Sequence, residues 1–189
     1  MENKEGEQVK ILINKMRVYM RDDNFRAIRM GLLIYNNYFN NLDKYEQYII
    51  IYNLALCYKK VGMYNEGLKF LQKAKLFTND TEQGYYRIKW LENELKIELK
   101  IDNKEETLNN YLECSKYYKK INSKIMRAYV LYNIAKYKKD GTKMFYMLKS
   151  IIKESDIIIP VFINYNKRAD VLDILNDLKK VNYNIYKNA

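Results

Sequence analysis

The chain has 189 residues, of which 48% are hydrophobic, and this is long enough for one domain with a sizeable core. Its formal net charge is +11, a balance that suits an acidic ligand, a nucleic acid or an anionic surface. With no His and only 6 Gly, it lacks the commonest general base and metal ligand and the material for a phosphate-binding loop. These absences argue against most hydrolase and nucleotide chemistry.

The positive charge has a second explanation, because Lys, Asn, Ile and Tyr are all abundant, as expected of an AT-rich coding sequence. The first residues are acidic and polar, unlike a secretory signal, and no apolar run approaches the roughly 20 residues of a membrane-spanning helix. We therefore expect no membrane span and a cytoplasmic protein. Cys57 and Cys114 lie inside helical patterns, which predicts reduced packing residues, no metal site and no cofactor.

The scarcity of Gly and Pro favours long helices joined by short turns. The first predicted helix pair spans 7 to 41 and turns at 22 to 24, and the second spans 44 to 78. Gly62 is expected to end the first helix of the second pair, because Gly accepts the left-handed backbone conformation. Apolar or small side chains follow one face of each helix in that pair, at Ile51, Leu54, Ala55, Tyr58, Gly67, Leu71 and Ala74.

Two further pairs are predicted at 81 to 120 and 123 to 154, with turns at 102 to 103 and 140 to 141. Ala169, Leu172, Leu175 and Leu178 then draw a helical stripe, so the segment 156 to 182 is expected to cap the last pair. A cap is needed because each repeat exposes an apolar face that a neighbour must cover. All these repeats belong to one predicted domain, residues 1 to 189.

Three charged residues, Glu94, Glu98 and Lys138, occupy positions where the repeat pattern expects core residues. The rotation of the helices in pairs three and four is therefore left open. Glu94 with Glu98 could bind a metal or act as an acid–base pair, but a solvated helix surface is the favoured interpretation.

The segment 48 to 79 resembles the tetratricopeptide repeat family in its Tyr52-Asn-Leu-Ala-Leu-Cys-Tyr58, Gly62-Met-Tyr-Asn-Glu-Gly67 and Leu71-Gln-Lys-Ala74 runs. Weaker copies keep the same register, since Tyr132-Asn-Ile-Ala135 echoes the first run. The resemblance implies an all-α, right-handed α-solenoid of about four helix pairs with a C-terminal capping helix pair. In such a solenoid the first helix of each pair lines the concave face.

Four Asn residues recur at equivalent places in the first helices, at Asn14, Asn53, Asn93 and Asn133, with spacings of 39, 40 and 40 residues. An Asn side chain carries both a donor and an acceptor, so such a row can hydrogen-bond the backbone of an extended peptide. Chance alignment in an Asn-rich sequence, or ties between neighbouring repeats, would give the same pattern.

Basic residues continue this face, and they could hold acidic side chains or a terminal carboxylate of a ligand. A solvated charged face is the alternative. Tyr52, Tyr129 and Tyr132 neighbour the face and could contact apolar ligand residues, although core packing explains them equally well. The basic positions are Arg17, Arg21, Lys60, Lys96, Lys100 and Lys136.

The pairs of about forty residues, the Asn row, Leu148-Lys-Ser-Ile-Ile, Ile159-Pro160 and the Leu-rich last helix resemble the repeat region of RRNPP-type peptide-pheromone receptors, which include the phage arbitrium receptors. The resemblance implies that the repeats enclose a short peptide whose backbone is held by Asn53, Asn93 and Asn133, and by Asn14. It also implies that peptide binding changes the activity of an effector region. No DNA-binding module is recognised ahead of the repeats, so a lone sensor, a fragment and a partner-blocking regulator all stay open.

We therefore expect a non-enzymatic regulatory protein that binds a short peptide or an extended, acidic protein segment. The alternative is a scaffold that grips a segment of a larger protein partner. A basic concave face also permits nucleic-acid contact, but no zinc finger, RNP-type motif or clear helix-turn-helix supports it. Homodimer formation is left open.

Overall fold

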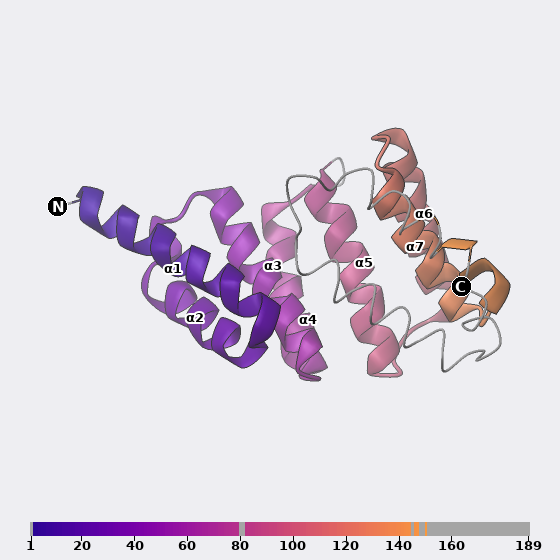
Figure 1. The fold of residues 1–189 in the computed structure, drawn as a ribbon, viewed down its shortest axis with the longest axis horizontal. Helices are drawn as coiled ribbons and strands as arrows, with labels where there is room; N and C mark the ends of the chain where they lie inside the picture. The colour runs from indigo at the N-terminus through magenta and orange to yellow at the C-terminus, as the bar shows by residue number, and fades with distance from the viewer. Residues whose placement is uncertain (1, 80–81, 145, 148–149, 151–189) are drawn as a thin grey trace. The chain divides into compact units, whose positions relative to one another are not determined.

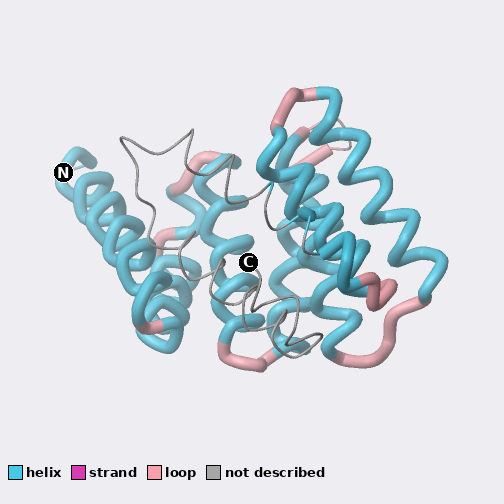
Figure 2. The backbone as a smooth tube through the Cα atoms, turned by 45° about the vertical axis from the view of Figure 1, so that its right-hand side comes forward, coloured by secondary structure: helices cyan, strands magenta, loops and turns pink. Residues whose placement is uncertain are grey.

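A computed structural model describes residues 2–79, 82–144, 146–147 and 150, and the statements below concern these residues. The regular elements in this part of the chain are helices, with no strand among them, and short loops join them (Figure 2). The chain forms two compact units, Met1–Asp102 and Asn103–Ala189, and each is described by itself. The sequence predicts one domain, whereas the boundary between these two units falls within predicted pair three, after Asp102.

Successive helices of the first unit lie against one another, and Figure 1 shows them in chain order. Short 3-10 helices, η1 at Phe39–Asn41 and η2 at Lys75–Phe77, follow the second and fourth. The α-helices are α1 (Glu2–Asp22), α2 (Asn24–Asn37), α3 (Lys44–Lys60), α4 (Tyr64–Ala74) and α5 (Gln83–Glu98).

Side-chain caps fix where α2 and α3 begin. Asp23 Oδ1 accepts the Arg26 backbone N–H at 3.0 Å, inside the turn predicted at 22 to 24. At α3, Asp43 Oδ1 accepts the Glu46 N–H at 2.7 Å and Glu46 Oε2 accepts the Asp43 N–H at 3.3 Å, which forms a capping box. Gly62 has a φ of 78° directly after α3, so the predicted glycine stop is confirmed.

Helix α3 contributes side chains to two apolar clusters. In one cluster Ile50, Leu54 and Cys57 of α3 join buried side chains of α1 and α2, including Met16. In the other, Tyr48, Ile51 and Ala55 of α3 join side chains of α4 and α5. Each large aliphatic side chain that is fully buried stabilises the fold by about 1.5–3 kcal/mol, so α3 is the element that ties the first unit together.

Two glycines allow the helices around α3 to approach closely. A Cβ built on Gly31 of α2 would lie 2.7 Å from both Leu54 Cδ2 and Met16 Cε, in the first cluster. A Cβ on Gly67 of α4 would lie 3.3 Å from the Ala55 carbonyl oxygen. The α2–α3 contact therefore depends on the missing side chain at Gly31.

In the second unit, α6 (Lys104–Lys120) and α7 (Lys124–Tyr137) pack against each other. Asn103 caps α6 by accepting the Glu106 N–H at 3.0 Å, and helical structure resumes at Gly141 after α7. Ala128, Tyr132, Ala135 and Met144 form a buried cluster. The predicted capping segment, 156 to 182, lies outside the described residues.

No helix in the described ranges combines the length and the apolar character that crossing a bilayer requires.

Replacing Gly31 by Ala should lower the free energy of unfolding by about 1–3 kcal/mol, because the new methyl group overpacks the contact with Leu54 and Met16. Gly6→Ala is the matched control, since its Cβ would meet nothing within 4 Å and Ala is the better helix former. Chemical denaturation of both variants measures the difference. Equal stability of the two variants would contradict the packing described for α2 and α3.

Candidate functional site

A hollow of about 110 Å³ lies between the first helices of the first two pairs, α1 and α3. It brings together two residues predicted from sequence to contact a ligand, Asn14 and Arg17. The other lining residues were not predicted from sequence; they are Lys10 and Ile13 of α1 and Tyr45, Glu46 and Ile49 of α3.

The α1 side of the hollow is basic and polar. Lys10, Asn14 and Arg17 follow one another at intervals of four and three residues, so they share a face of the helix, and all three are exposed. Arg21 is four residues further along this face and is also exposed. The side chain of Ile13 is buried and forms an apolar part of the lining.

The α3 side of the hollow combines Tyr45 and Ile49 with the acidic Glu46, whose Oε2 accepts the Asp43 N–H. Tyr45 is 69% exposed, and Ile49 lies one turn further along the helix. Asn53 and Lys60 continue the same stripe four and eleven residues after Ile49, so α3 also carries predicted site residues on this face. We call these two stripes together the α1–α3 surface. It consists of residues 10, 14, 17 and 21 of α1 and residues 45, 49, 53 and 60 of α3.

The four Asn residues differ in accessibility. Asn14 is exposed and Asn53 is half-buried, so both can be reached from solvent. Asn93 of α5 is only 1% exposed, and its side chain is already engaged within the structure. Asn133 is half-buried on α7 and belongs to the second unit, where it too is engaged. The structure therefore brings only Asn14 and Asn53 to the α1–α3 surface.

The predicted tyrosines mainly serve packing. Tyr52 is half-buried and stacks on Tyr48 with ring centroids 5.6 Å apart. Tyr132 is 2% exposed and lies in the buried cluster of α7, and Tyr129 packs against that cluster. Of the two interpretations of Tyr132, ligand contact and core packing, its burial supports core packing.

The predicted basic positions fall into two groups. Lys96 Nζ lies 3.5 Å from Glu92 Oε1, and Lys75 Nζ lies 2.7 Å from Glu92 Oε2, so the charge of Lys96 is partly neutralised. The other predicted cations are exposed. They are Arg17 and Arg21 on α1, Lys60 at the end of α3, Lys100 after α5, and Lys136 on α7.

Glu94 shows why a charged residue can occupy a core position. Its carboxylate accepts hydrogen bonds from Lys59 Nζ of α3 and, at 3.0 Å, from the indole Nε1 of Trp90. The Lys59 and Glu94 side chains are 30% and 23% exposed, so the pair is largely shielded from water. Glu94 thus joins α5 to α3, and neither a metal site nor acid–base chemistry is required to explain it.

Two groups that could act as nucleophiles, the Cys57 thiol and the Tyr48 phenol, are buried. Burial raises the pKa of the Cys57 thiol to about 12, and it raises the pKa of the Tyr48 phenol to about 12 as well. At neutral pH both groups are therefore protonated. Among the described residues, no group of three His, Cys, Asp or Glu side chains is placed to hold a metal ion.

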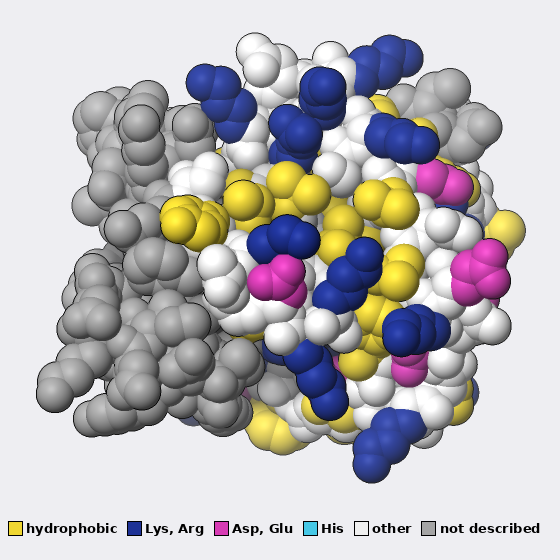
Figure 3. All heavy atoms as spheres, turned by 90° about the vertical axis from the view of Figure 1, so that its right-hand side faces the viewer, with side chains coloured by type: hydrophobic (Ala, Val, Ile, Leu, Met, Phe, Trp, Pro, Cys, Tyr) yellow, Lys and Arg dark blue, Asp and Glu magenta, His cyan; other side chains and the backbone are white. Residues whose placement is uncertain are grey.

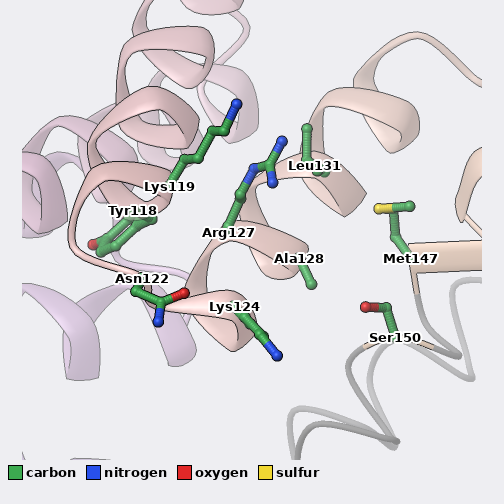
Figure 4. Close-up of a pocket in the computed structure, with 9 residues that line it drawn as sticks. All are labelled: Tyr118, Lys119, Asn122, Lys124, Arg127, Ala128, Leu131, Met147 and Ser150. Carbon is green, nitrogen blue, oxygen red and sulfur yellow. The ribbon is translucent and has the colours of Figure 1, made fainter.

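A larger cavity, of about 390 Å³, lies in the second unit and was missed from sequence. Lys119, Lys124 and Arg127 are among its lining residues (Figure 4). One signal was available: four basic and no acidic residues stand between 119 and 127. This run spans the turn between α6 and α7, so it does not share the repeating positions of the first helices on which the sequence prediction rests.

Glu94→Ala should lower the free energy of unfolding by about 1–3 kcal/mol, because the hydrogen bonds that Lys59 and the Trp90 indole donate to Glu94 are both lost. The emission of Trp90, the single Trp of the chain, should shift at the same time. The control is Glu98→Ala, since Glu98 is exposed at the C-terminal end of α5, where a negative charge is not favoured. If Glu94→Ala and Glu98→Ala have the same stability and the same Trp90 emission, the link between α3 and α5 through Lys59 and Glu94 is ruled out.

No protein-family model matches this sequence, and the searches of curated proteins and of solved structures found no match either. The function of the chain has therefore to be argued from its own residues.

Proposed function

We propose that this chain is a non-enzymatic regulatory protein that binds a short, extended peptide on the concave face of a right-handed, tetratricopeptide-like solenoid. The observation that carries the proposal is the hollow between α1 and α3, where Asn14 and Arg17 meet Tyr45 and Ile49. These are first helices of successive pairs, which are the helices that line the concave face in the repeat family the sequence resembles.

The chemistry of the α1–α3 surface suits a peptide backbone with an acidic group. Asn14 and Asn53 each offer an amide donor and acceptor, which is what an extended backbone requires. Lys10, Arg17 and Arg21 supply cations for a side-chain or terminal carboxylate, and Arg can bind it in a bidentate manner. Tyr45 gives an exposed ring for an apolar ligand residue.

The resemblance to RRNPP-type receptors supports a role in peptide signalling within the cytoplasm, in which the bound peptide changes the activity of a partner protein. The scaffold alternative uses the same surface to grip an extended segment of a larger protein. The two differ in the ligand: a receptor is saturated by a free peptide, whereas a scaffold requires the partner protein.

The proposal is tested by selecting ligands from a library of random linear peptides displayed on phage. Selected peptides, fluorescently labelled, are then titrated with the protein and with Asn14→Ala, Arg17→Gln and Asn53→Ala. Each substitution should weaken binding by about 1–3 kcal/mol, because it leaves a polar group of the peptide without its partner. Fluorescence anisotropy measures the dissociation constants.

The matched controls are Asn36→Ala and Arg29→Gln, which remove the same side-chain types from exposed positions of α2, outside the α1–α3 surface. Both should bind the selected peptides as the unchanged protein does. Failure to select any peptide, or equal weakening by the α2 and α1–α3 substitutions, would contradict the proposal. Binding of a protein partner but of none of its isolated segments would also contradict it.

A further inference from the structure

The cavity of about 390 Å³ in the second unit has no role in the function proposed above. It is formed by the C-terminal end of α6, the first turns of α7, and Met147 and Ser150 (Figure 4). This volume falls within the range of small-molecule sites, about 300–1,000 Å³. None of its lining residues belongs to the α1–α3 surface, so it is a separate site from the proposed peptide groove.

The described lining of the cavity is positively charged. Lys119, Lys124 and Arg127 contribute to it, and no Asp or Glu is among the lining residues that the structure describes. None of the three cations forms an ion pair with an acidic residue in the described part of the chain. Figure 4 shows Lys119 and Arg127 extending in the same direction, while Lys124 extends toward the other end of the cavity. An anion in this cavity would therefore meet cations from both α6 and α7.

Arg127 gives an independent reason to expect an anion. Its Nε is buried and has no hydrogen-bond partner among the described residues. A buried donor of a charged group that lacks an acceptor is costly, and an anionic ligand would supply the acceptor. Arg is also the side chain best shaped to bind phosphate through two parallel hydrogen bonds.

The start of α7 adds to the positive potential at this place. Its N-cap residue, Ser123, makes no side-chain capping bond, and its first turn holds no acidic residue. By contrast, α2, α3 and α6 begin with capping bonds from Asp23, Asp43 and Asn103. The partial positive charge of the α7 N-terminus therefore adds to that of Lys124 and Arg127.

The rest of the lining fits a small organic group. Ala128, Leu131 and Met147 give an apolar wall, and Figure 4 shows Met147 on the side of the cavity opposite α7. Asn122 and Ser150 add polar groups that can hydrogen-bond a sugar or an amide.

We propose that this cavity is a binding site for phosphate, either as the free ion or as the monoester of a small molecule, with Arg127 and Lys119 as its main ligands. The site belongs to the second unit and does not require that the α1–α3 surface bind a peptide.

Isothermal titration of the full chain with inorganic phosphate, adenosine monophosphate and adenosine tests the proposal and distinguishes the two sources of phosphate. We expect inorganic phosphate, the monophosphate or both to bind with a dissociation constant below about 1 mM, and adenosine to bind at least about tenfold more weakly. Tighter binding of the monophosphate than of phosphate identifies a monoester. Equal or tighter binding of phosphate identifies the free ion.

The variants Arg127→Gln and Lys119→Gln should each weaken binding by about tenfold or more, because a charge-assisted hydrogen bond is lost. The matched control, Lys120→Gln, removes the neighbouring exposed charge, which does not line the cavity, and should bind normally. Circular dichroism checks that each variant is folded. If Arg127→Gln does not fold, Lys119→Gln decides, since Lys119 is exposed and its replacement should not disturb the fold.

Three results would overturn the proposal. The first is no binding of phosphate or the monophosphate, and the second is the same affinity for Lys119→Gln and Lys120→Gln. The third is binding to single-stranded oligonucleotides that grows with their length while the monophosphate does not bind, since that would identify a nucleic-acid surface in place of a small-molecule site.

Discussion

The burial of α3 on two sides is the interaction on which the first unit depends. Ile50, Leu54 and Cys57 pack toward α1 and α2, while Ile51 and Ala55 pack toward α4 and α5. Tyr45, Asn53 and Lys60 lie on the remaining stripe of α3, together with Ile49, which also packs against the second cluster. The position of that stripe beside α1, and hence the hollow between the two helices, follows from this packing and from the close approach allowed by Gly31.

The parts of the fold that were predictable from sequence are those with local causes. The glycine stop at Gly62 and the turn at Asp23 follow from backbone conformation and from hydrogen bonds spanning three residues. The role of Glu94 was not predictable, because its partner Lys59 lies 35 residues away. The same limit applies to Asn93: it keeps the spacing of the row, but its burial depends on the surrounding packing.

The candidate surfaces differ in the signal they leave in the sequence. Asn14 was found because it begins a row of Asn at the period of the helix pairs, and Arg17 because it follows Asn14 on the same helical face, whereas Lys119 and Arg127 flank a turn and belong to no such row. The exposed side chains drawn in Figure 3 include many Lys and Arg around apolar groups, so net charge alone does not distinguish a site from solvated surface. What distinguishes these two places is a cavity in which polar and charged groups from different helices meet.

Native-state hydrogen exchange measured along the first unit tests most directly whether α3 holds the proposed binding surface in place. If α3 does so, the backbone amides around Leu54 and Ala55, which belong to the two apolar clusters, should be the slowest to exchange. They should exchange only when the first unit unfolds globally. The amides of residues 6–8 of α1, whose side chains are exposed, should exchange much faster. Exchange in α3 at the rate of residues 6–8 would contradict this role of α3.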